Sequence, residues 1–453
     1  MLFKSLALKN FKCFEEVEVE FAPITLLTGA NSGGKSSLIY SLLAMLQTEQ
    51  FPFYLSPNGK YVDMGSFKEM VYQGDVSEEI EIILESLFDN SLLDFYGDSE
   101  IISKWSFDHR NNLPVVSYFK TEINRGTYEL IKNLSNKYLF NYQYRHLWGA
   151  QYYEKIQSAA SLNSNIKKHL FSAENERLEN VSIDVNLLSV KEGPFNSLQE
   201  LKSCISTLGD FNCALDKPVS EYIEGCAEYM ENLFNYIGSF RLSPERTYYQ
   251  KAKAQEKVGV NGEGYIDQII EWEETNPEKF EELNEIMADL ELIQSIQSEK
   301  MKGGRFELTV KTKENSSSAS LTDVGFGISQ FLPLIVADLQ LRDNSCLTLS
   351  QPEIHLHPKI QALFGNYLAK QINKSSKQYI VETHSEYLLN RIRLLLVKGE
   401  LKPEEVRIYY FENDGIKSVV HNVEFTTDGQ IVGAPDGFFD TYGLDVMDIA
   451  LNA

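Results

Sequence analysis

The sequence predicts an α/β fold with a central mixed sheet and a mostly helical insertion, and three observations support this prediction. An apolar run at 24–28 ends at Gly29 and is followed by helical spacing over 36–46. From Leu332 onward, helical and strand patterns alternate, as is typical of a sheet covered by helices. At about 92–235 the glycine loops disappear and aromatic residues become frequent.

These observations divide the chain into three segments. Residues 1–91 begin with two alternating stretches, 2–8 and 17–21, which predict strands. We expect 92–235 to be an inserted, mostly helical lobe that includes a helix at 221–234. The segment 236–453 is expected to complete the α/β part and to end in a small tail.

The last segment can be described element by element. An acidic stretch with helical spacing predicts a helix at 278–300, and 306–312 predicts a strand. The remaining periodic segments predict helices at 332–341, 360–372 and 385–397, and strands at 347–349, 379–383, 406–411 and 419–423.

Composition and charge restrict the function. The chain has 453 residues, with 42 Lys and Arg against 65 Asp and Glu, which gives a net charge of −23. This acidity disfavours a protein that grips nucleic acid through a broad basic surface. The five cysteines lack CxxC spacing, which indicates a reducing compartment. With neither a signal-peptide pattern nor an apolar run long enough for a membrane span, we expect a cytoplasmic protein without membrane contact.

The most specific motif is the glycine loop at 29–36, which fits GxxxxGK[ST] between a predicted strand and a predicted helix. Glycines let backbone N–H groups turn towards phosphate, the helix N-terminus adds positive potential, and lysine reaches the β- and γ-phosphates. The alternative is an ordinary glycine turn before a helix. The candidate nucleotide-binding residues here are Asn31, Ser32, Gly33, Gly34, Lys35, Ser36 and Ser37, with the Ser36 hydroxyl as a ligand for Mg²⁺.

Three further motifs stand at predicted element ends. The sequence Gln351-Pro352-Glu353-Ile354-His355-Leu356-His357-Pro358 follows one apolar strand, and Glu382-Thr383-His384-Ser385 ends another. The glycine-rich turn at 323–330 opens a helix and offers a second helix N-terminus that could face phosphate.

Together these motifs resemble the ABC-type P-loop ATPase heads of the RecF, SMC and OLD group. The similarity covers about the first 90 and the last 200 residues. It is greatest to stand-alone bacterial AAA-type ATPases, which share the segments 351–358, 382–391 and 435–440. The resemblance implies that ATP and Mg²⁺ are cofactors. It also implies a face-to-face dimer, in which one phosphate loop meets the signature turn of the other chain.

The resemblance also assigns roles to single residues. His384 corresponds to the switch histidine that contacts the γ-phosphate, and Lys12, in Asn10-Phe11-Lys12, corresponds to a residue near the nucleotide. In the signature turn the corresponding nucleotide-binding residues are Gly327, Ser329 and Gln330. The same comparison places Ser350 and Gln351 where hydrolytic relatives carry acids.

This replacement leaves two alternatives for hydrolysis. In one, ATP is hydrolysed slowly, with Gln351 orienting water, Glu353 or Glu382 supplying charge, and His384 assisting. In the other, the chain only binds ATP as a long-lived clamp. Serine is a weak Mg²⁺ ligand beside a carboxylate, so Ser350 is at most a weak metal ligand. The candidate catalytic residues are therefore Gln351, Glu353 and His384, and we expect weak hydrolysis.

Relatives of this kind resemble the ATPase subunits of anti-phage defence systems, such as PtuA of Septu. The expected partners are a second copy, or a higher oligomer formed through the ATP sites, and a separate effector, a nuclease or toxin. Nucleic acid would then be contacted through that partner. Two alternatives remain: a RecF- or SMC-like DNA repair clamp, and a scaffold that uses ATP only to hold subunits together.

Four other residues are candidates for a site but also have structural interpretations. His355 and His357 are spaced i, i+2, which suits two metal ligands poorly, and we interpret them as part of a structural loop. Arg241 and Arg246 lie in one turn and either pair with acids or face the nucleotide.

Overall fold

The computed structural model describes residues 2–48, 53–88, 99–123, 126–133, 137–146, 186–195, 232–249, 257–435 and 438. The chain divides into two compact units. Unit 1 comprises residues 1–2, 20–39 and 232–453, and unit 2 comprises 3–19 and 40–231. The predicted α/β class with a mixed sheet is confirmed.

Unit 1 is built on a seven-stranded sheet. Its strands, in spatial order, are β10 (Phe234–Ile237), β15 (Cys346–Ser350), β16 (Gln378–Glu382), β3 (Ile24–Gly29), β17 (Val406–Asn413), β18 (Ser418–Phe425) and β19 (Ile431–Val432). The first five are parallel, β18 runs antiparallel to β17, and β19 runs antiparallel to β18. Every residue of β15 and β16 is buried, as expected for parallel strands covered on both faces.

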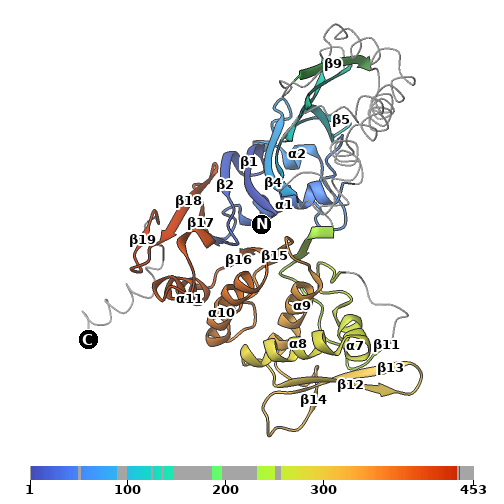
Figure 1. Cartoon of the computed structure of the whole chain (residues 1–453), viewed down its shortest axis with the longest axis vertical. Helices are drawn as coiled ribbons and strands as arrows, with labels where there is room; N and C mark the ends of the chain where they lie inside the picture. The colour runs from blue at the N-terminus through green and yellow to red at the C-terminus, as the bar shows by residue number, and fades with distance from the viewer. Residues whose placement is uncertain are drawn as a thin grey trace, which may run out of the picture. The chain divides into compact units, whose positions relative to one another are not determined.

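The described helices and helical turns of the two units are the following. They are α1 (Lys35–Leu46), α2 (Phe67–Met70), η1 (Tyr72–Gly74), α7 (Tyr265–Thr275), α8 (Pro277–Asp289), α9 (Phe326–Gln340), α10 (Pro358–Lys374), α11 (Glu386–Val397) and η4 (Pro403–Glu405). The α10 and α11 helices lie side by side (Figure 1), and a Cβ on Gly365 would be 2.9 Å from Arg391 Cγ. Each of these two helices begins at a side-chain cap: His357 accepts from the Lys359 N–H, and Ser385 accepts from the Leu388 N–H.

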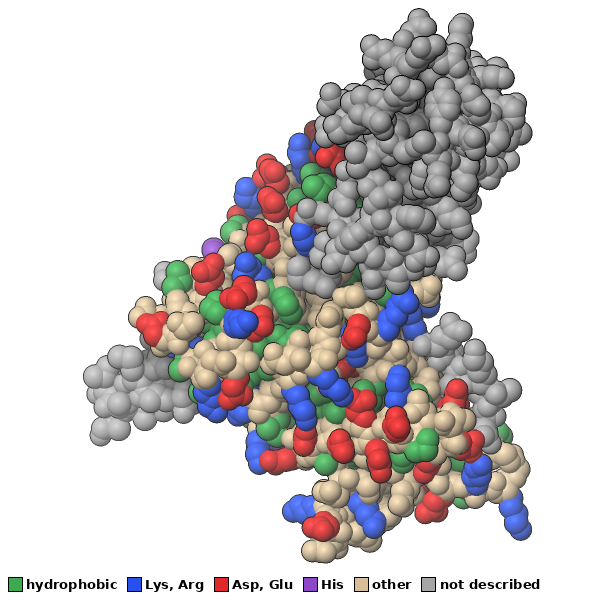
Figure 2. Space-filling view, in the orientation of Figure 1, with side chains coloured by type: hydrophobic (Ala, Val, Ile, Leu, Met, Phe, Trp, Pro, Cys, Tyr) green, Lys and Arg blue, Asp and Glu red, His purple; other side chains and the backbone are tan. Residues whose placement is uncertain are grey.

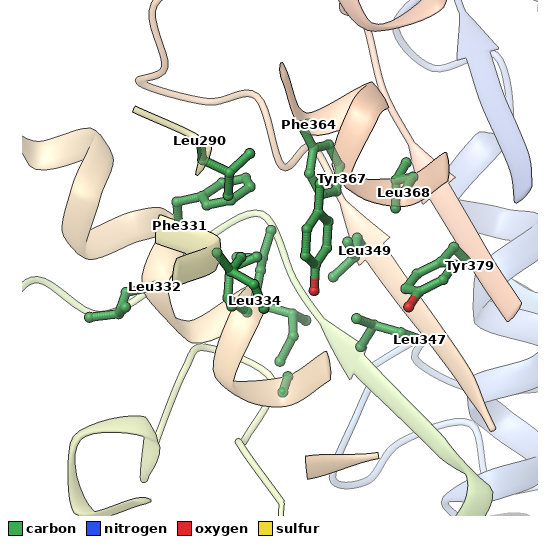
Figure 3. Packing of buried hydrophobic residues seen from close by; sticks show 14 of the residues in the cluster. Leu290, Phe331, Leu332, Leu334, Leu347, Leu349, Phe364, Tyr367, Leu368 and Tyr379 are labelled. Carbon is green, nitrogen blue, oxygen red and sulfur yellow. The ribbon is translucent and has the colours of Figure 1, made fainter. Parts of the chain in front are cut away.

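The core of unit 1 joins α9 to the sheet. Figure 3 shows Phe331 and Leu334 of α9 on one side and Leu347 and Leu349 of β15 on the other. The ring of Phe364 packs edge-on against Phe331, with centroids 5.2 Å apart. This packing fixes β15, the strand that the Gln351-Pro352-Glu353 segment follows.

A small sheet lies against the helices α7 and α8 in unit 1. It consists of β11 (Tyr248–Tyr249), β13 (Arg305–Lys311), β12 (Ser295–Met301) and β14 (Ala319–Ser320). The prediction of one helix over 278–300 is wrong beyond Asp289, where α8 ends. Residues 295–301 instead pair antiparallel with β13, and the Ile296 N–H donates to Asn284 Oδ1 of α8 at 2.7 Å.

Unit 2 contains an eight-stranded sheet. Its strands, in spatial order, are β2 (Phe14–Glu20), β1 (Phe3–Phe11), β4 (Ile80–Phe88), β5 (Ser99–Arg110), β6 (Leu113–Ile123), β7 (Gly126–Lys132), β8 (Tyr138–His146) and β9 (Asn186–Phe195). Each neighbouring pair from β1 to β9 is antiparallel.

The expectation of a mostly helical insertion is therefore wrong for the described part of 92–235, which is strand from β5 to β10 apart from a short helical turn before β10. The physical reason is a period of two: Trp105 and Phe107 on β5 are buried, and Ser103 shares a buried hydrogen bond with Thr121. The turn between β5 and β6 has positive φ at Asn111 and Asn112, as a tight hairpin requires. The helix expected at 221–234 falls mostly outside the described residues.

None of the helices in the described part of the chain combines the length and apolar character needed to cross a membrane.

Candidate functional site

The glycine loop leaves β3 and passes close to β17. The Ala30 N–H donates to the Phe411 carbonyl at 3.0 Å. A Cβ on Gly29 would lie 2.2 Å from that carbonyl oxygen, and one on Gly33 would lie 2.7 Å from it. These two positions therefore require glycine because the neighbouring strand approaches so closely.

The loop then turns through left-handed conformations into α1. Ser32 has φ 61° and Gly34 has φ 105°. Residues 30–32 are exposed to solvent. The Leu38 N–H donates to the Gly34 carbonyl at 3.1 Å, and α1 begins at Lys35. Positive φ within such a loop, followed by a helix N-terminus, is the backbone arrangement of an anion-binding nest.

Lys35 lies across this loop. Its Nζ donates to the carbonyls of Gly29 at 3.0 Å and Ala30 at 2.7 Å, and the residue is buried. Burial lowers the pKa of Lys35, and the nearby carboxylates of Glu382 and Glu353 act in the opposite direction. The predicted phosphate-binding lysine is thus a buried cation held at the loop, with acids beside it.

A carboxylate from the neighbouring strand joins the two candidate metal ligands. Ser36 Oγ donates to Glu382 Oε1 at 2.8 Å, and Ser350 Oγ donates to Glu382 Oε2. Ser350 and Glu382 are register partners at the carboxyl ends of β15 and β16. The sequence indicated Glu382 only as one possible source of charge, although its position at a strand end beside His384 was a usable signal.

Arg241 holds the turn after β15. Its Nη2 donates to the carbonyls of Ser350 at 2.8 Å and Gln351 at 3.1 Å, and Gln351 has φ 48°. The Gln351 N–H donates to the Glu382 carbonyl at 2.7 Å. Burial lowers the pKa of Arg241 to about 10, and its buried Nε and Nη1 have no hydrogen-bond partner among the described residues. Arg241 therefore binds main-chain carbonyls at the end of β15, which is neither of the two alternatives that the sequence left open, and its contact with a nucleotide stays a prediction.

Glu353 and His384 form the outer part of this cluster. Glu353 Oε1 accepts from the His384 N–H at 2.6 Å, whereas its buried Oε2 has no partner within the described structure. Burial raises the pKa of Glu353. Partial burial and the charge of Lys35 lower the pKa of His384, which favours the neutral imidazole near pH 7. The three candidate catalytic residues thus lie at the adjacent carboxyl ends of β15 and β16.

The signature turn is largely packed against its own chain. A Cβ on Gly327 would lie 2.5 Å from the His355 carbonyl oxygen, and the Phe326 ring meets the His355 ring edge-on at 4.9 Å. Ser329 Oγ donates to the Phe326 carbonyl at 2.8 Å, and Gln330 Nε2 donates to the Leu242 carbonyl at 3.2 Å. Both polar side chains are buried, so the surface of the turn is formed by its first residues.

Lys12 belongs to unit 2. Its backbone N–H donates to the Met70 carbonyl at 2.6 Å, and its Nζ donates to the Met64 carbonyl at 3.4 Å. Burial lowers the pKa of Lys12. The contacts described for Lys12 are therefore made within that unit.

Of the other predicted positions, Asn31 is exposed in the glycine loop and Ser37 is half-buried in the first turn of α1. Arg246 forms an exposed pair with Asp323, with Nη1 and Oδ2 3.0 Å apart. His357 caps α10 through its ring nitrogen, which agrees with its interpretation as a structural residue.

The oxygen donors beside the loop suit Mg²⁺. Among the described residues, no group of three or more His, Cys, Asp or Glu side chains is arranged to hold a metal. Two hydroxyls and one carboxylate gather beside the loop instead, those of Ser36, Ser350 and Glu382. Mg²⁺ commonly takes one or two carboxylates and completes its coordination with phosphate and water, so this donor set fits it.

The fold and the loop define a P-loop nucleotide-binding protein, and the comparison with known families agrees. Residues 1–389 match the family described as "AAA ATPase domain", and residues 401–449 match one described as "Protein of unknown function (DUF3696)". The first match covers most of the chain, which therefore belongs to the AAA ATPase domain family. Membership implies nucleotide binding, usually with Mg²⁺. No curated protein matches the chain.

Three solved structures are similar to the chain at low identity. The Smc head domain of Pyrococcus furiosus, with an extended coiled coil and bound to the C-terminal domain of ScpA, is 12% identical, with 99% of each chain covered and a TM-score of 0.42. The SMC head domain of Thermotoga maritima is 12% identical, with 94% of this chain and 100% of that one covered and a TM-score of 0.35. An SmcHead bound to the C-winged helix domain of ScpA is 13% identical, with 93% and 97% covered and a TM-score of 0.42. With TM-scores this low, no conclusion about function rests on these likenesses.

Proposed function

We propose that this chain binds ATP with Mg²⁺ at the glycine loop and hydrolyses it slowly, and that the nucleotide controls assembly with a partner. One observation carries the proposal. Lys35, Ser36, Glu382 and Glu353 gather where the adjacent parallel strands β15, β16 and β3 end. Ligands of open α/β sheets bind at this edge because loops from neighbouring strands meet there.

Each residue of the cluster has a separate task in this proposal. Lys35 and the N–H groups of the loop balance the phosphate charge, and Ser36 and Glu382 hold Mg²⁺. When bound, Mg²⁺ neutralises charge that develops on the phosphate oxygens. Gln351 can orient a water but cannot take its proton. Glu353, with its pKa raised by burial, is a stronger base than an ordinary glutamate and can accept that proton.

We propose slow turnover because the residues directly at the end of β15 are neutral. Ser350 and Gln351 supply no carboxylate, and Glu353 stands two residues further along the chain. The Glu353 carboxylate is also tied to the His384 N–H. Since Oε1 is held by this bond, Oε2 is the oxygen left to act on water, which supports slow over fast hydrolysis.

The proposed dimer face is the surface around the first residues of α9. Three large apolar side chains are exposed there: Phe240 at 87%, Leu242 at 51% and Phe326 at 43%. The Gln330 side chain ties the segment with Phe240 and Leu242 to α9. An apolar surface of this kind at a signature turn supports contact with a second copy across ATP. Since Ser329 and Gln330 are already bonded within their own chain, the backbone near Phe326 would make that contact.

We further propose that the effector is a separate protein, such as a nuclease or toxin in an anti-phage defence system. The motif resemblance supports this role. The net charge of −23 and the interspersed acidic and basic side chains on the face in Figure 2 disfavour a clamp that binds DNA directly. Salt-sensitive DNA binding by the purified chain would favour the clamp instead.

The test measures uptake of labelled ATP and single-turnover release of phosphate. Wild-type protein should bind ATP saturably and release phosphate well below about 10 s⁻¹, a typical enzyme rate. Lys35→Met should weaken ATP binding by about 100-fold or more, because a buried cation at the phosphates is lost. Lys359→Met is the matched control, since Lys359 is exposed and pairs with Glu291.

Two results would contradict the proposal. Equal ATP affinity in the wild type and in Lys35→Met would remove the glycine loop as the binding site. Fast phosphate release would remove the slow mechanism. Mass measurement with and without ATP tests the dimer, which Phe326→Ser should weaken and Lys35→Met should abolish.

A further inference from the structure

We infer that Glu382 is the carboxylate that positions Mg²⁺ in this chain. It lies at the end of β16, whereas the acid of hydrolytic relatives is expected at the end of the neighbouring strand β15. This inference rests on the proposed function. Glu382 ends β16, which lies between β15 and β3 in the sheet. Neighbouring strands are about 4.8 Å apart, so the Glu382 carboxylate lies one strand nearer to the glycine loop than an acid at the end of β15 would.

The contacts of Glu382 agree with this role. Each carboxylate oxygen accepts one hydroxyl: Oε1 from Ser36 at the start of α1, and Oε2 from Ser350 at the end of β15. The carboxylate therefore lies between the two residues that the sequence predicts as metal ligands. Two hydroxyl donors fix its orientation without using up all of its lone pairs, since a carboxylate has about four acceptor sites.

The charge of Glu382 points in the same direction. The residue is 5% exposed, and within the described ranges neither of its oxygens has an ion-pair partner within 4.0 Å. Lys35 is a nearby cation, but its Nζ is bonded to the carbonyls of Gly29 and Ala30 and not to this carboxylate. A buried carboxylate without a cation in direct contact is unfavourable, and a divalent cation at the hydroxyl of Ser36 would supply that contact.

The competing explanation is that Glu382 only ties the ends of β15 and β16 to the start of α1. The register of the sheet separates the two explanations. Ser350 and Glu382 are direct partners, so exchanging them, in the double variant S350E/E382S, moves the carboxylate back by one strand and keeps a hydroxyl beside it. The single variant Ser350→Glu cannot replace the double exchange in this test, because it would place two carboxylates side by side and change their ionisation.

The experiment titrates a fluorescent ATP analogue in Mg²⁺ and in EDTA, and measures bound Mn²⁺ by electron paramagnetic resonance. The proteins are the wild type, Glu382→Gln, the double exchange and Glu386→Gln. Glu386 is an exposed acid in the first turn of α11 and is the matched control. We expect Mg²⁺ to tighten binding in the wild type and in Glu386→Gln. Glu382→Gln should lose at least about 10-fold of that tightening, with EDTA affinity within about 3-fold, and the double exchange should regain part of it.

Three results would overturn the assignment. Full Mg²⁺ dependence in Glu382→Gln shows that another group holds the metal. Equal loss in Mg²⁺ and in EDTA, together with a lower melting temperature, shows a structural tie. A folded double exchange without any Mg²⁺ dependence shows that the site does not accept the acid from β15. If the wild type takes up no nucleotide in either buffer, the proposal of ATP binding itself fails, which is a different outcome from nucleotide uptake that ignores Mg²⁺.

Discussion

The buried polar groups at the two ends of the parallel sheet in unit 1 differ in how completely they are hydrogen-bonded. At the amino-terminal end, Asp338 of α9 accepts from the Tyr379 hydroxyl at 2.9 Å, from the Lys377 ammonium at 3.2 Å and from the Tyr367 hydroxyl. Burial raises the pKa of both tyrosines well above the usual value, so they remain donors. Apart from the neutral Ser345 hydroxyl, the polar side chains of this cluster are paired.

The carboxyl-terminal end is less completely satisfied. Among the described residues, Glu353 Oε2 and two nitrogens of Arg241 are buried without hydrogen bonds. Unsatisfied buried groups cost stability and persist where they have another use. The comparison indicates that one end of the sheet holds the fold together, and it supports the proposal that the other end receives a ligand. Single substitutions at the two ends should therefore separate stability from activity.

The largest expected effect is at the amino-terminal end. Asp338→Ala leaves Lys377 buried without its anion and should lower the local stability of the sheet by about 3–5 kcal/mol. Hydrogen exchange of peptides from β15 and β16 in increasing urea measures this change. ATP affinity should stay within about 3-fold, since the site lies at the other strand ends.

The control for this prediction is Asp289→Ala. Asp289 forms an exposed ion pair with Lys370, which contributes about 0–1 kcal/mol. If Asp338→Ala instead reduced ATP affinity by the same free energy as stability, the two ends would not be separable.

Part of the fold follows from local patterns in the sequence. The strand, glycine loop and helix at 24–46 were predictable because an apolar run, a glycine spacing and helical periodicity follow one another. In unit 2, the strands predicted at 2–8 and 17–21 correspond to β1 and β2, but β4 to β9 were missed. On β5, Trp105 and Phe107 alternate with polar residues, but the hairpin turn uses Asn111-Asn112 with positive φ instead of glycine. Without a glycine to mark this turn, the hairpin was not predicted.

The site was predictable to a different extent. Lys35, Ser36, Gln351, Glu353 and His384 were predicted from motifs, because the glycine loop and the two later segments each follow a predicted strand. The contact between Glu382 and Ser350 could not be read in the same way. It depends on which strands are neighbours and in which register, and the sequence separation of 32 positions says nothing about either.

An intermediate effect is expected for Glu353→Gln at the carboxyl-terminal end. Hydrolysis should fall by about 100-fold, as for loss of a general base, while ATP affinity changes by less than about 3-fold. In the wild type, hydrolysis should fall on the acid side as Glu353 gains a proton, at a pH above the ordinary glutamate value of 4.5. The variant should lack this acid limb in a single-turnover pH profile.

The pH dependence of stability gives an independent check on Glu353. Hydrolysis should rise with pH as Glu353 loses its proton, whereas stability should fall. Because the pKa is raised in the folded state, the folded protein holds the proton more tightly than the unfolded chain between the two pKa values. Wild-type stability should therefore fall as pH rises through that interval, whereas Glu353→Gln should show less of this fall in urea unfolding. A variant that is equally active, or that loses stability at pH 8, would contradict the role of a buried base.

The smallest expected effect is at Arg241, whose Nη2 alone donates to two carbonyls of the turn after β15. Arg241→Lys keeps the charge but lacks the rigid planar group that places this nitrogen, so hydrolysis should fall by roughly 5- to 10-fold, about 1 kcal/mol in the barrier. Arg246→Lys, on the exposed pair with Asp323, is the matched control and should change hydrolysis less than about 2-fold. Arg241→Lys also removes two buried nitrogens that have no hydrogen-bond partner among the described residues, so the free energy of unfolding of this variant should stay equal or rise. A slower but no less stable variant would mean that the strand ends keep unsatisfied groups for activity. A variant with normal hydrolysis and lower stability would place Arg241 with the structural end of the sheet instead.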